Sequence, residues 1–264
     1  MSIKDSKVTF NVDTLSVHIF PNRQAMGEAA AHHISDKMQK LIREYGSIRM
    51  IFASAPSQNE VLATLSTLPG IDWSKVTAFH MDEYIGIPGD SPQSFGYYIR
   101  EHLWDKVSPK HVHFINSLAE NPQKECRRYA ALISESPIDI VCMGIGENGH
   151  IAFNDPPVAN FNDPEVVKIV ELDEACRRQQ VNDGCFSSLS VVPKTAITLT
   201  VPTLFSGKHL ICVVPGPTKT KAVFNTLTNR IDATCPATIL RTHPQAVLYL
   251  DKTAAAKLDD GGLS

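Results

Sequence analysis

A histidine between two short polar side chains is the first feature of this 264-residue sequence that could support chemistry. His150 lies within residues 144–157, with Asn148 two positions before it and Asp155 five positions after it. Both side chains reach the imidazole if the segment curls back on itself, and a histidine oriented by a polar neighbour commonly transfers protons. A histidine that only braces a loop would look the same in sequence, so this segment alone leaves both interpretations open.

Two adjacent acids, Asp82 and Glu83, follow the apolar run at residues 76–81. A carboxylate at the end of a buried strand is a candidate general base, because its surroundings can tune its proton affinity. Paired acids in this position also cap the turn that follows a strand. We therefore treat one of the two as a candidate base and keep turn capping as the alternative.

Residues 215–221 combine a Pro-Gly-Pro turn with two threonines and two lysines before an amphipathic segment. Backbone N–H groups at the start of a helix attract anions, and Lys219 and Lys221 would add positive charge there. The segment lacks the spacing of a nucleotide P-loop, so a single small phosphate is the better candidate. The alternative is an ordinary cationic helix surface on which both lysines face water.

Residues 144–149 have the Gly-x-Gly-x-x-Gly spacing of a dinucleotide-binding turn. In that motif the third glycine opens a helix, whereas Gly149 is followed by a segment with paired prolines that favours a loop. We therefore expect no nicotinamide or flavin cofactor. The glycines instead let the backbone approach a small ligand, and we place Gly149 among the substrate-binding residues.

The cysteines and histidines show no familiar metal-binding spacing. The six cysteines include no C-x-x-C pair and are scattered along a chain long enough to form a large core, so we expect reduced, structural thiols. His111 and His113 form an H-x-H pair without a nearby third ligand. The sequence therefore predicts neither a metal site nor any other cofactor.

Short β-branched apolar runs that alternate with amphipathic segments must position these loops. The runs predict strands at residues 48–53, 76–81, 138–143, 196–201, 209–214 and 246–250. Three- and four-residue spacing predicts helices at residues 23–45, 58–68, 94–104, 123–134 and 218–228. This alternation indicates a doubly wound, mostly parallel α/β sheet of Rossmann-like type with helices on both faces. No linker or repeat divides the chain, so we expect residues 1–264 to form one domain, with the reactive loops at the carboxyl ends of the strands.

Composition excludes several classes of partner. The 25 Lys and Arg against 28 Asp and Glu provide no overall positive field for a nucleic acid or an anionic membrane surface. No apolar run approaches the ~20 residues of a membrane span, and the first residues lack the apolar core of a signal peptide. We therefore expect a cytoplasmic enzyme that acts on a small molecule, and we leave open that it forms a homo-oligomer.

Four segments together resemble the glucosamine-6-phosphate deaminase/isomerase family in order and spacing: residues 79–103, 143–157, 191–207 and 235–255. The related 6-phosphogluconolactonases share the fold but usually carry Asp-Glu-Arg where residues 82–84 are Asp-Glu-Tyr. They also usually carry Ser-Leu-Phe-Pro where residues 153–156 are Phe-Asn-Asp-Pro. The chain is therefore more similar to the deaminases.

The resemblance implies that the chain opens the ring of glucosamine 6-phosphate, or of an epimer such as galactosamine 6-phosphate. It further implies proton transfer between C2 and C1 and release of ammonia to leave a ketose 6-phosphate, without metal or nucleotide. Asp82 corresponds to the base for enolisation and His150 to the ring-opening histidine, while Lys221 corresponds to the phosphate-binding lysine. Arg178 is the best match for a phosphate-binding arginine. The other residues that we assign to substrate binding are Ser54, Ser57, Glu83 and Gly149.

The sequence departs from the family pattern around the histidine. Family members usually carry Asp and Glu at the positions of Asn148 and Asp155, and we keep both residues in the catalytic group. An amide cannot stabilise an imidazolium by charge, so His150 is expected to accept a proton less readily than usual. Residues 53–58 also lack the glycines of the family's phosphate loop, and residues 157–167 show no counterpart of an allosteric site.

Two other functions remain as alternatives. One is a 6-phosphogluconolactonase-like hydrolase, because one fold can host several chemistries and a histidine can also activate water. The other is a non-catalytic sugar-phosphate sensor that has kept the pocket and lost turnover. Release of ammonia distinguishes the deaminase from both.

Overall fold

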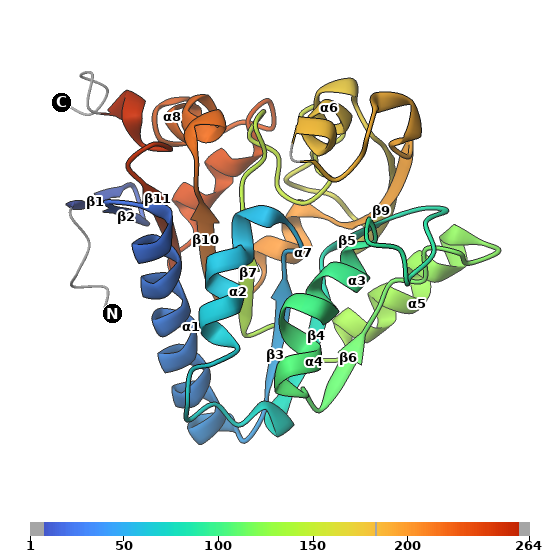
Figure 1. Ribbon diagram of the computed structural model, residues 1–264, viewed down its shortest axis with the longest axis horizontal. Coiled ribbons are helices and arrows are strands. Elements are labelled where there is room, and N and C mark those ends of the chain that lie inside the picture. The colour runs from blue at the N-terminus through green and yellow to red at the C-terminus, as the bar shows by residue number, and fades with distance from the viewer. Residues whose placement is uncertain (1–7, 183, 259–264) are drawn as a thin grey trace.

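The computed structural model describes residues 8–182 and 184–258. Its central feature is an eight-stranded sheet with the order β1-β2-β11-β10-β7-β3-β4-β6 (Figure 1). All neighbouring strands in it pair in parallel except β1, which joins the edge of β2 in antiparallel fashion. In chain order the strands are Val8–Val12 (β1), Leu15–Phe20 (β2), Ile48–Phe52 (β3), Val76–His80 (β4), His111–His113 (β6), Ile140–Met143 (β7), His209–Val214 (β10) and Ala246–Asp251 (β11).

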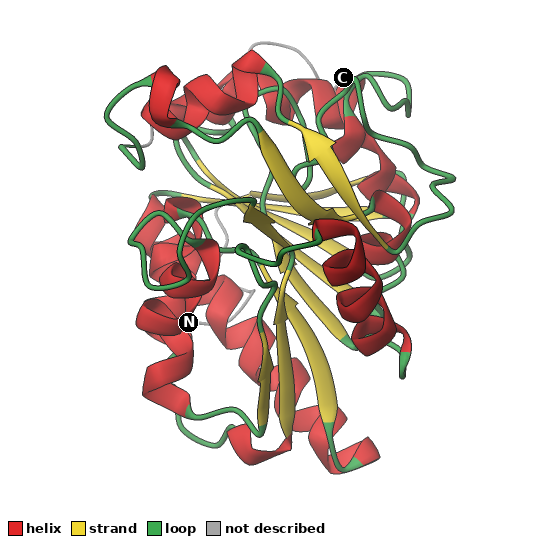
Figure 2. Cartoon of the chain, turned by 90° about the vertical axis from the view of Figure 1, so that its right-hand side faces the viewer, coloured by secondary structure: helices red, strands yellow, loops and turns green. Residues whose placement is uncertain are grey.

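Helices cover this sheet on both faces (Figure 2). Alternate residues of β10 belong to two different buried clusters, as a strand buried on both faces requires. One cluster contains side chains of α5 (Pro122–Ser134) and α8 (Thr220–Thr228), and the other contains side chains of α1 (Arg23–Tyr45) and α2 (Asn59–Leu65). The sheet is therefore the middle layer between two hydrophobic cores.

The remaining helices are short. The α-helices are α3 (Phe95–Ile99), α4 (Asp105–Val107), α6 (Glu174–Asn182) and α7 (Val201–Phe205), and a π-helical turn at Arg100–Trp104 joins α3 to α4. The 3₁₀ turns are Pro56–Gln58, Trp73–Lys75, Leu189–Val191, Pro217–Lys219, Pro236–Thr242 and Ala256–Leu258. No helix within the described residues is both long and apolar enough to cross a membrane.

A second, three-stranded antiparallel sheet has the order β5-β9-β8. Its strands are Asp82–Tyr84 (β5), Thr195–Leu199 (β9) and Val167–Glu171 (β8). The strand expected at residues 196–201 is confirmed as β9, which pairs in antiparallel fashion in this small sheet and lies outside the parallel one. The apolar pattern of a segment predicts a buried strand but does not identify its partner. Here β5 begins only two residues after β4 ends and pairs with β9 beyond the large sheet.

The other expected strands are confirmed as β3, β4, β7, β10 and β11, and the α/β class with a mostly parallel sheet is confirmed as well. Sequence reasoning missed β1, β2, β5, β6 and β8, which have six residues or fewer. Several of these strands carry polar residues at alternate positions or throughout, as in the His-Val-His of β6. Such segments lack the continuous apolar run of a central parallel strand.

The strand order reverses between β3 and β7. From β3 the order continues through β4 to β6, and from β7 it continues in the other direction through β10 to β11. In open α/β sheets, ligands bind outside the carboxyl ends of the strands at such a reversal. The loops that follow β10, β7, β3 and β4 leave four adjacent strands, so they meet at one edge of the sheet.

Candidate active site

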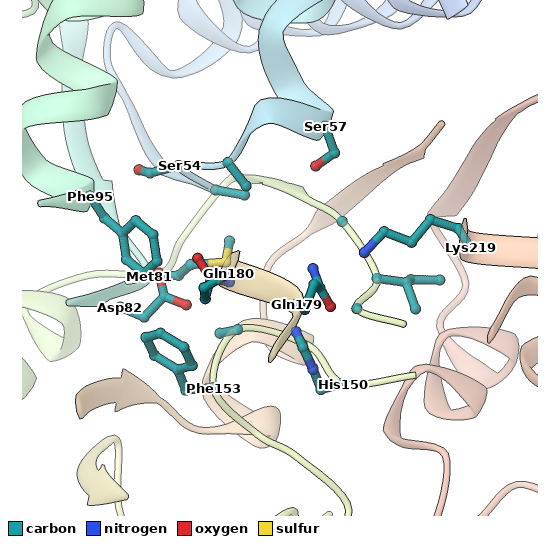
Figure 3. Close-up of a pocket in the computed structure, with 16 residues that line it drawn as sticks. Ser54, Ser57, Met81, Asp82, Phe95, His150, Phe153, Gln179, Gln180 and Lys219 are labelled. Atoms are coloured by element: carbon teal, nitrogen blue, oxygen red, sulfur yellow. The ribbon is translucent and has the colours of Figure 1, made fainter. Parts of the chain in front are cut away.

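A cleft lies at this edge, beside the point where the strand order reverses. It holds about 540 Å³ of empty space, including the part open to solvent, which is in the range of small-molecule sites. Its walls come from the loops after β3, β4, β7 and β10 and from α6. Figure 3 shows its labelled side chains: Ser54, Ser57, Met81, Asp82, Phe95, His150, Phe153, Gln179, Gln180 and Lys219.

Asp82 provides a buried carboxyl group in the cleft. It is the first residue of β5 and lines the cavity, and only 8% of its surface is exposed. Burial raises the pKa of the Asp82 carboxyl well above its ordinary value, and the negative charge of Glu83 adds to this effect. A carboxylate with a raised pKa is a stronger proton acceptor when ionised, which is the property that a general base requires.

His150 lines the cleft and lies next to the carboxylate of Asp155. The Nδ1 atom of His150 lies 2.9 Å from Oδ1 of Asp155, and the Asp155 side chain is fully buried. Burial acts to raise the pKa of Asp155, but the hydrogen bond and charge of His150, together with the amide of Asn148, lower it below its ordinary value. The carboxylate therefore lies against the Nδ1 side of the ring, at ion-pair distance but without a hydrogen bond of normal geometry, and Nε2 is the other ring nitrogen that can exchange a proton.

Asn148 supports this pair without contacting the imidazole by a hydrogen bond. Its Nδ2 atom donates to Oδ1 of Asp155 at 2.8 Å, and its Oδ1 atom accepts the backbone N–H of His150 at 3.0 Å. The loop therefore curls back as the sequence suggested. Asn148 orients the acid and the backbone of the histidine, and only Asp155 faces the ring nitrogen.

Gly146 explains the glycine-rich loop before the histidine. A Cβ atom on Gly146 would lie 2.1 Å from Nε2 of His150, a distance that real Cβ atoms do not adopt. The second glycine of the Gly-x-Gly-x-x-Gly string is therefore needed so that the imidazole can lie against the backbone. The motif serves the histidine here and does not open a helix, because a turn follows it.

Hydroxyl and ammonium groups line the part of the cleft next to β3 and β10. Ser54 and Ser57 follow β3, and Lys219 ends the 3₁₀ turn Pro217–Lys219 after β10. The Oγ atom of Ser54 is buried without a hydrogen-bond partner among the described residues. Leaving a buried hydroxyl unpaired costs free energy, so a ligand oxygen at this position would be stabilised. Within the described chain, Lys219 is the only Lys or Arg that lines the cleft.

Comparison with known proteins agrees with this geometry. The model of the family described as glucosamine-6-phosphate isomerases/6-phosphogluconolactonase matches residues 21–249. The chain belongs to this family. Glucosamine-6-phosphate deaminases of Bacillus thuringiensis (strain Al Hakam) and Bacillus anthracis (strain A0248) are 36% identical over 184 residues, which are 70% of this chain and 68% of each relative. The resemblance inferred from the four segments is thus confirmed.

Solved structures of the glucosamine-6-phosphate isomerase/6-phosphogluconolactonase family share the fold. The structure of a monomeric glucosamine-6-phosphate deaminase superposes with a TM-score of 0.83 at 28% identity, covering 91% of this chain and 98% of that one. A 6-phosphogluconolactonase from Thermotoga maritima superposes with a TM-score of 0.74 at 20% identity, covering 90% of this chain and all of that one. At 20% identity, the similarity to the 6-phosphogluconolactonase shows a shared fold and nothing about activity.

Two of the cationic assignments made for this family member are not supported by the structure. Lys221 is exposed and lines a second cavity, whereas Lys219 reaches the cleft. Two residues of helix rotate a side chain by roughly 200°, so the two lysines face opposite ways. Arg178 is exposed and pairs with Glu174 one turn earlier on α6. The residues of α6 that line the cleft are Gln179 and Gln180.

Two further substrate-binding assignments are also corrected. The carboxylate of Glu83 does not line the cleft; it accepts hydrogen bonds from Oγ of Ser94 at 2.7 Å and from the backbone N–H groups of Phe95 at 3.1 Å and Gly96 at 2.9 Å. Glu83 therefore holds the start of α3, which is the capping alternative. Gly149 adopts φ +88°, and a Cβ there would lie 2.6 Å from Sγ of Cys235, so this glycine serves the turn and not the ligand.

Sequence reasoning missed several residues of the cleft. Phe95 and Phe153 form an aromatic contact with ring centroids 5.6 Å apart, and both line the cavity. Gln179 accepts the backbone N–H of Glu147 at 3.0 Å and so connects α6 to the histidine loop. The Phe-Asn-Asp-Pro string near the histidine was a visible signal for Phe153, but no pattern distinguished the two glutamines from Arg178.

Proposed function

We propose that the chain converts a hexosamine 6-phosphate and water into a ketose 6-phosphate and ammonia. The observation that carries this proposal is the cleft, which places a buried carboxyl, a histidine–carboxylate pair and a lysine at the ends of adjacent strands. These groups suit a small anionic sugar that must gain and lose protons. The family membership and the deaminases among the relatives point to the same reaction.

His150 serves the first step. With Nδ1 beside Asp155, the Nε2 side of its ring can take the proton of the C1 hydroxyl and return a proton to the ring oxygen, which opens the hexosamine. No net proton is consumed. The fixed ring orientation matters because proton transfer needs a donor and an acceptor at hydrogen-bond distance.

Asp82 serves the second step. Its carboxylate removes the C2 proton of the open-chain aldehyde, and the electron pair moves toward C1 to give an enol that carries the amino group. A proton delivered to C1 then leaves a C2 iminium, which water hydrolyses to the ketone with loss of ammonia. The raised pKa of Asp82 suits a group that both accepts and returns a proton.

Lys219, Ser54 and Ser57 are assigned to the phosphate. An ammonium group provides a charge-assisted contact to a phosphate oxygen, and the two hydroxyls can donate hydrogen bonds beside it. This assignment replaces Lys221 and Arg178. The site as proposed holds the phosphate through one cation in the cleft and does not use an arginine.

The chain is further expected to act in the cytoplasm without a cofactor, and a homo-oligomer stays a prediction. The preferred epimer is also a prediction, with glucosamine 6-phosphate as the first candidate because the curated relatives are named for it. The experiment is a coupled ammonia assay with glucosamine 6-phosphate and galactosamine 6-phosphate, with 6-phosphogluconolactone hydrolysis measured in parallel. Ammonia from either hexosamine supports the proposal. Lactone hydrolysis without ammonia, or binding without any product, contradicts it.

A further inference from the structure

Three buried side chains behind the cleft have the chemistry of a zinc site. Donor atoms of His150, Asp155 and Cys176 all lie within 4.8 Å of one another. The three side chains are 9%, 0% and 1% exposed, respectively. Imidazole nitrogen, carboxylate oxygen and thiolate sulfur are the ligands that Zn²⁺ takes in proteins. The spacing of cysteines in the sequence gave no sign of this group, because Cys176 comes from α6 and the other two residues come from the histidine loop.

Two donor atoms in this group, Nδ1 of His150 and Oδ2 of Asp155, are buried without a hydrogen bond of normal geometry among the described residues. Oδ1 of Asp155 is bonded to Asn148 and faces Nδ1 of His150, whereas Oδ2 is buried without a hydrogen bond of normal geometry. The Cys176 thiol lies beside this carboxylate and interacts with it. A buried carboxylate oxygen next to a thiol and an imidazole is poorly solvated, so a cation bound among the three would replace missing interactions.

A second cavity also borders the group. It is lined by Cys176, Asn148, Gln179 and Lys221, among others, and holds about 770 Å³ of empty space including the part open to solvent. His150 lines the substrate cleft, Cys176 lines this second cavity, and Asp155 lines neither. A hydrated ion can therefore reach the thiol without entering the space of the sugar phosphate.

The separations of the donor atoms can be compared with those of a tetrahedral zinc site. With Zn–N and Zn–O bonds near 2.0–2.1 Å and a Zn–S bond near 2.3 Å, the ligand atoms of a tetrahedral site lie roughly 3.3–3.7 Å apart. The donor atoms already lie within 4.8 Å of one another, so their separations need to shrink by roughly 1–1.5 Å at most. Water from the second cavity can take the fourth position. The thiol loses its proton to solvent when the Zn–S bond forms.

We infer that His150, Asp155 and Cys176 form a zinc-binding site, and that occupation of this site inhibits the enzyme. Zinc bound at Nδ1 of His150 would take the place of a proton on that nitrogen, so the ring would keep its single proton on Nε2 and any Nδ1 proton would pass to solvent. The histidine then cannot cycle through the protonated form that ring opening needs. The inhibitory half of this inference rests on the proposed function, whereas the binding half does not.

Cobalt provides a direct readout of binding. A Co²⁺–thiolate bond gives a charge-transfer absorption band, and bonds from Co²⁺ to nitrogen or oxygen ligands do not give this band. The full chain, freed of metal with a chelator, is titrated with Co²⁺ and then with Zn²⁺. We expect one Co²⁺ per chain with a thiolate band that Zn²⁺ abolishes. Cys176→Ser should remove the band and weaken zinc binding by at least about 100-fold, since even partners outside the ligand shell cost roughly 10–100-fold.

Cys126→Ser is the matched control, because Cys126 is equally buried on α5 and does not belong to this group. The band should persist unchanged in it. A wild-type protein without the band, or a Cys176→Ser protein that keeps it, overturns the inference. Should Cys176→Ser not fold, the ¹¹³Cd chemical shift of the cadmium-loaded wild type decides instead, because a sulfur ligand shifts it strongly and its absence contradicts the site.

Turnover measured on the same samples separates the two proposals. Zinc should abolish hexosamine turnover in the wild type at one equivalent and leave Cys176→Ser far less sensitive. A wild type that shows the band but keeps full turnover with zinc bound contradicts the inhibitory half. A metal-free wild type without turnover contradicts the proposed function, while the absorption band still tests the zinc site.

Discussion

Lys219 and Lys221 are two residues apart, yet Lys219 lines the substrate cleft and Lys221 lines the second cavity. The first lysine is 6% exposed, whereas the second is exposed to solvent. They therefore provide a matched pair for assigning the phosphate contact.

Lys219→Ala should raise the Michaelis constant for a hexosamine 6-phosphate by about 10- to 150-fold, because a charge-assisted contact is worth roughly 1.5–3 kcal/mol. Lys221→Ala removes the same charge from the protein and should leave the Michaelis constant nearly unchanged. Steady-state kinetics of both variants provide the measurement. A Michaelis constant that rises in Lys221→Ala and stays unchanged in Lys219→Ala would show that Lys221 contacts the phosphate.

This pair also shows how far the sequence can specify the site. The segment after β10 was correctly predicted to reach a helix start, but the side of the helix that faces the cleft depends on where the helix begins. Here the 3₁₀ turn ends at Lys219 and α8 begins at Thr220, a boundary that no sequence pattern marked. Arg178 was misplaced for the same reason, because one residue of helix rotation brings Gln179 to the cleft instead.

The strands, too, could be predicted from the sequence only in part. Continuous apolar runs identified the five central parallel strands β3, β4, β7, β10 and β11, since burial on both faces requires such runs. The partner of β9 could not be predicted, because β5 has only three residues and all of them are polar or aromatic. Cys176 likewise meets His150 only through the packing of α6, a contact between segments that no local pattern encodes.

Asp82→Asn keeps the shape of the side chain and removes its basicity. Loss of a general base commonly lowers the rate by about 10²–10⁴, and we expect a fall of that order in turnover and in exchange of the C2 hydrogen with deuterium from solvent. NMR of the substrate in deuterated buffer measures the exchange. Asp72→Asn, on an exposed turn, is the control and should behave like the wild type. Exchange at wild-type speed in Asp82→Asn would rule out its role.

Gly146→Ala tests the contact between the loop and the imidazole. The added methyl group would lie 2.1 Å from Nε2 of His150, so the ring must move out of position. We expect a large loss of turnover, together with a loss of stability of about 1–3 kcal/mol from overpacking. Gly89→Ala is the control, because no atom lies within 4 Å of a Cβ built there. Full activity in Gly146→Ala would contradict the placement of His150.

Asn148→Asp tests the support of Asp155. The amide now donates to Oδ1 of Asp155 at 2.8 Å, and an aspartate would place a second negative charge there. Because the pKa of Asp155 is lowered in the folded protein, this carboxylate contributes stability above its unfolded pKa of about 3.9, and the contribution is lost as the pH falls through the lower folded pKa. The substitution should raise the pKa of Asp155 and shift this loss to higher pH.

The expected result for Asn148→Asp is a protein less stable than the wild type by about 1–3 kcal/mol at pH 8, with a smaller difference at pH 5, where the two acids can share a proton. Denaturant unfolding at both pH values measures it. Activity above that of the wild type, with unchanged stability, would instead favour the expectation that an acid at this position assists His150. That outcome would show that the side chain turns from Asp155 toward the ring.

The central claim is that the cleft releases ammonia from a hexosamine 6-phosphate. The most direct measurement follows one reaction of the metal-free wild-type chain with glucosamine 6-phosphate and quantifies ammonium and ketose 6-phosphate together by NMR. The account predicts that the two products appear in equal amounts, and that Asp82→Asn forms neither at a comparable rate. Unchanged substrate with both glucosamine 6-phosphate and galactosamine 6-phosphate, or a ketose formed without ammonium, would contradict it.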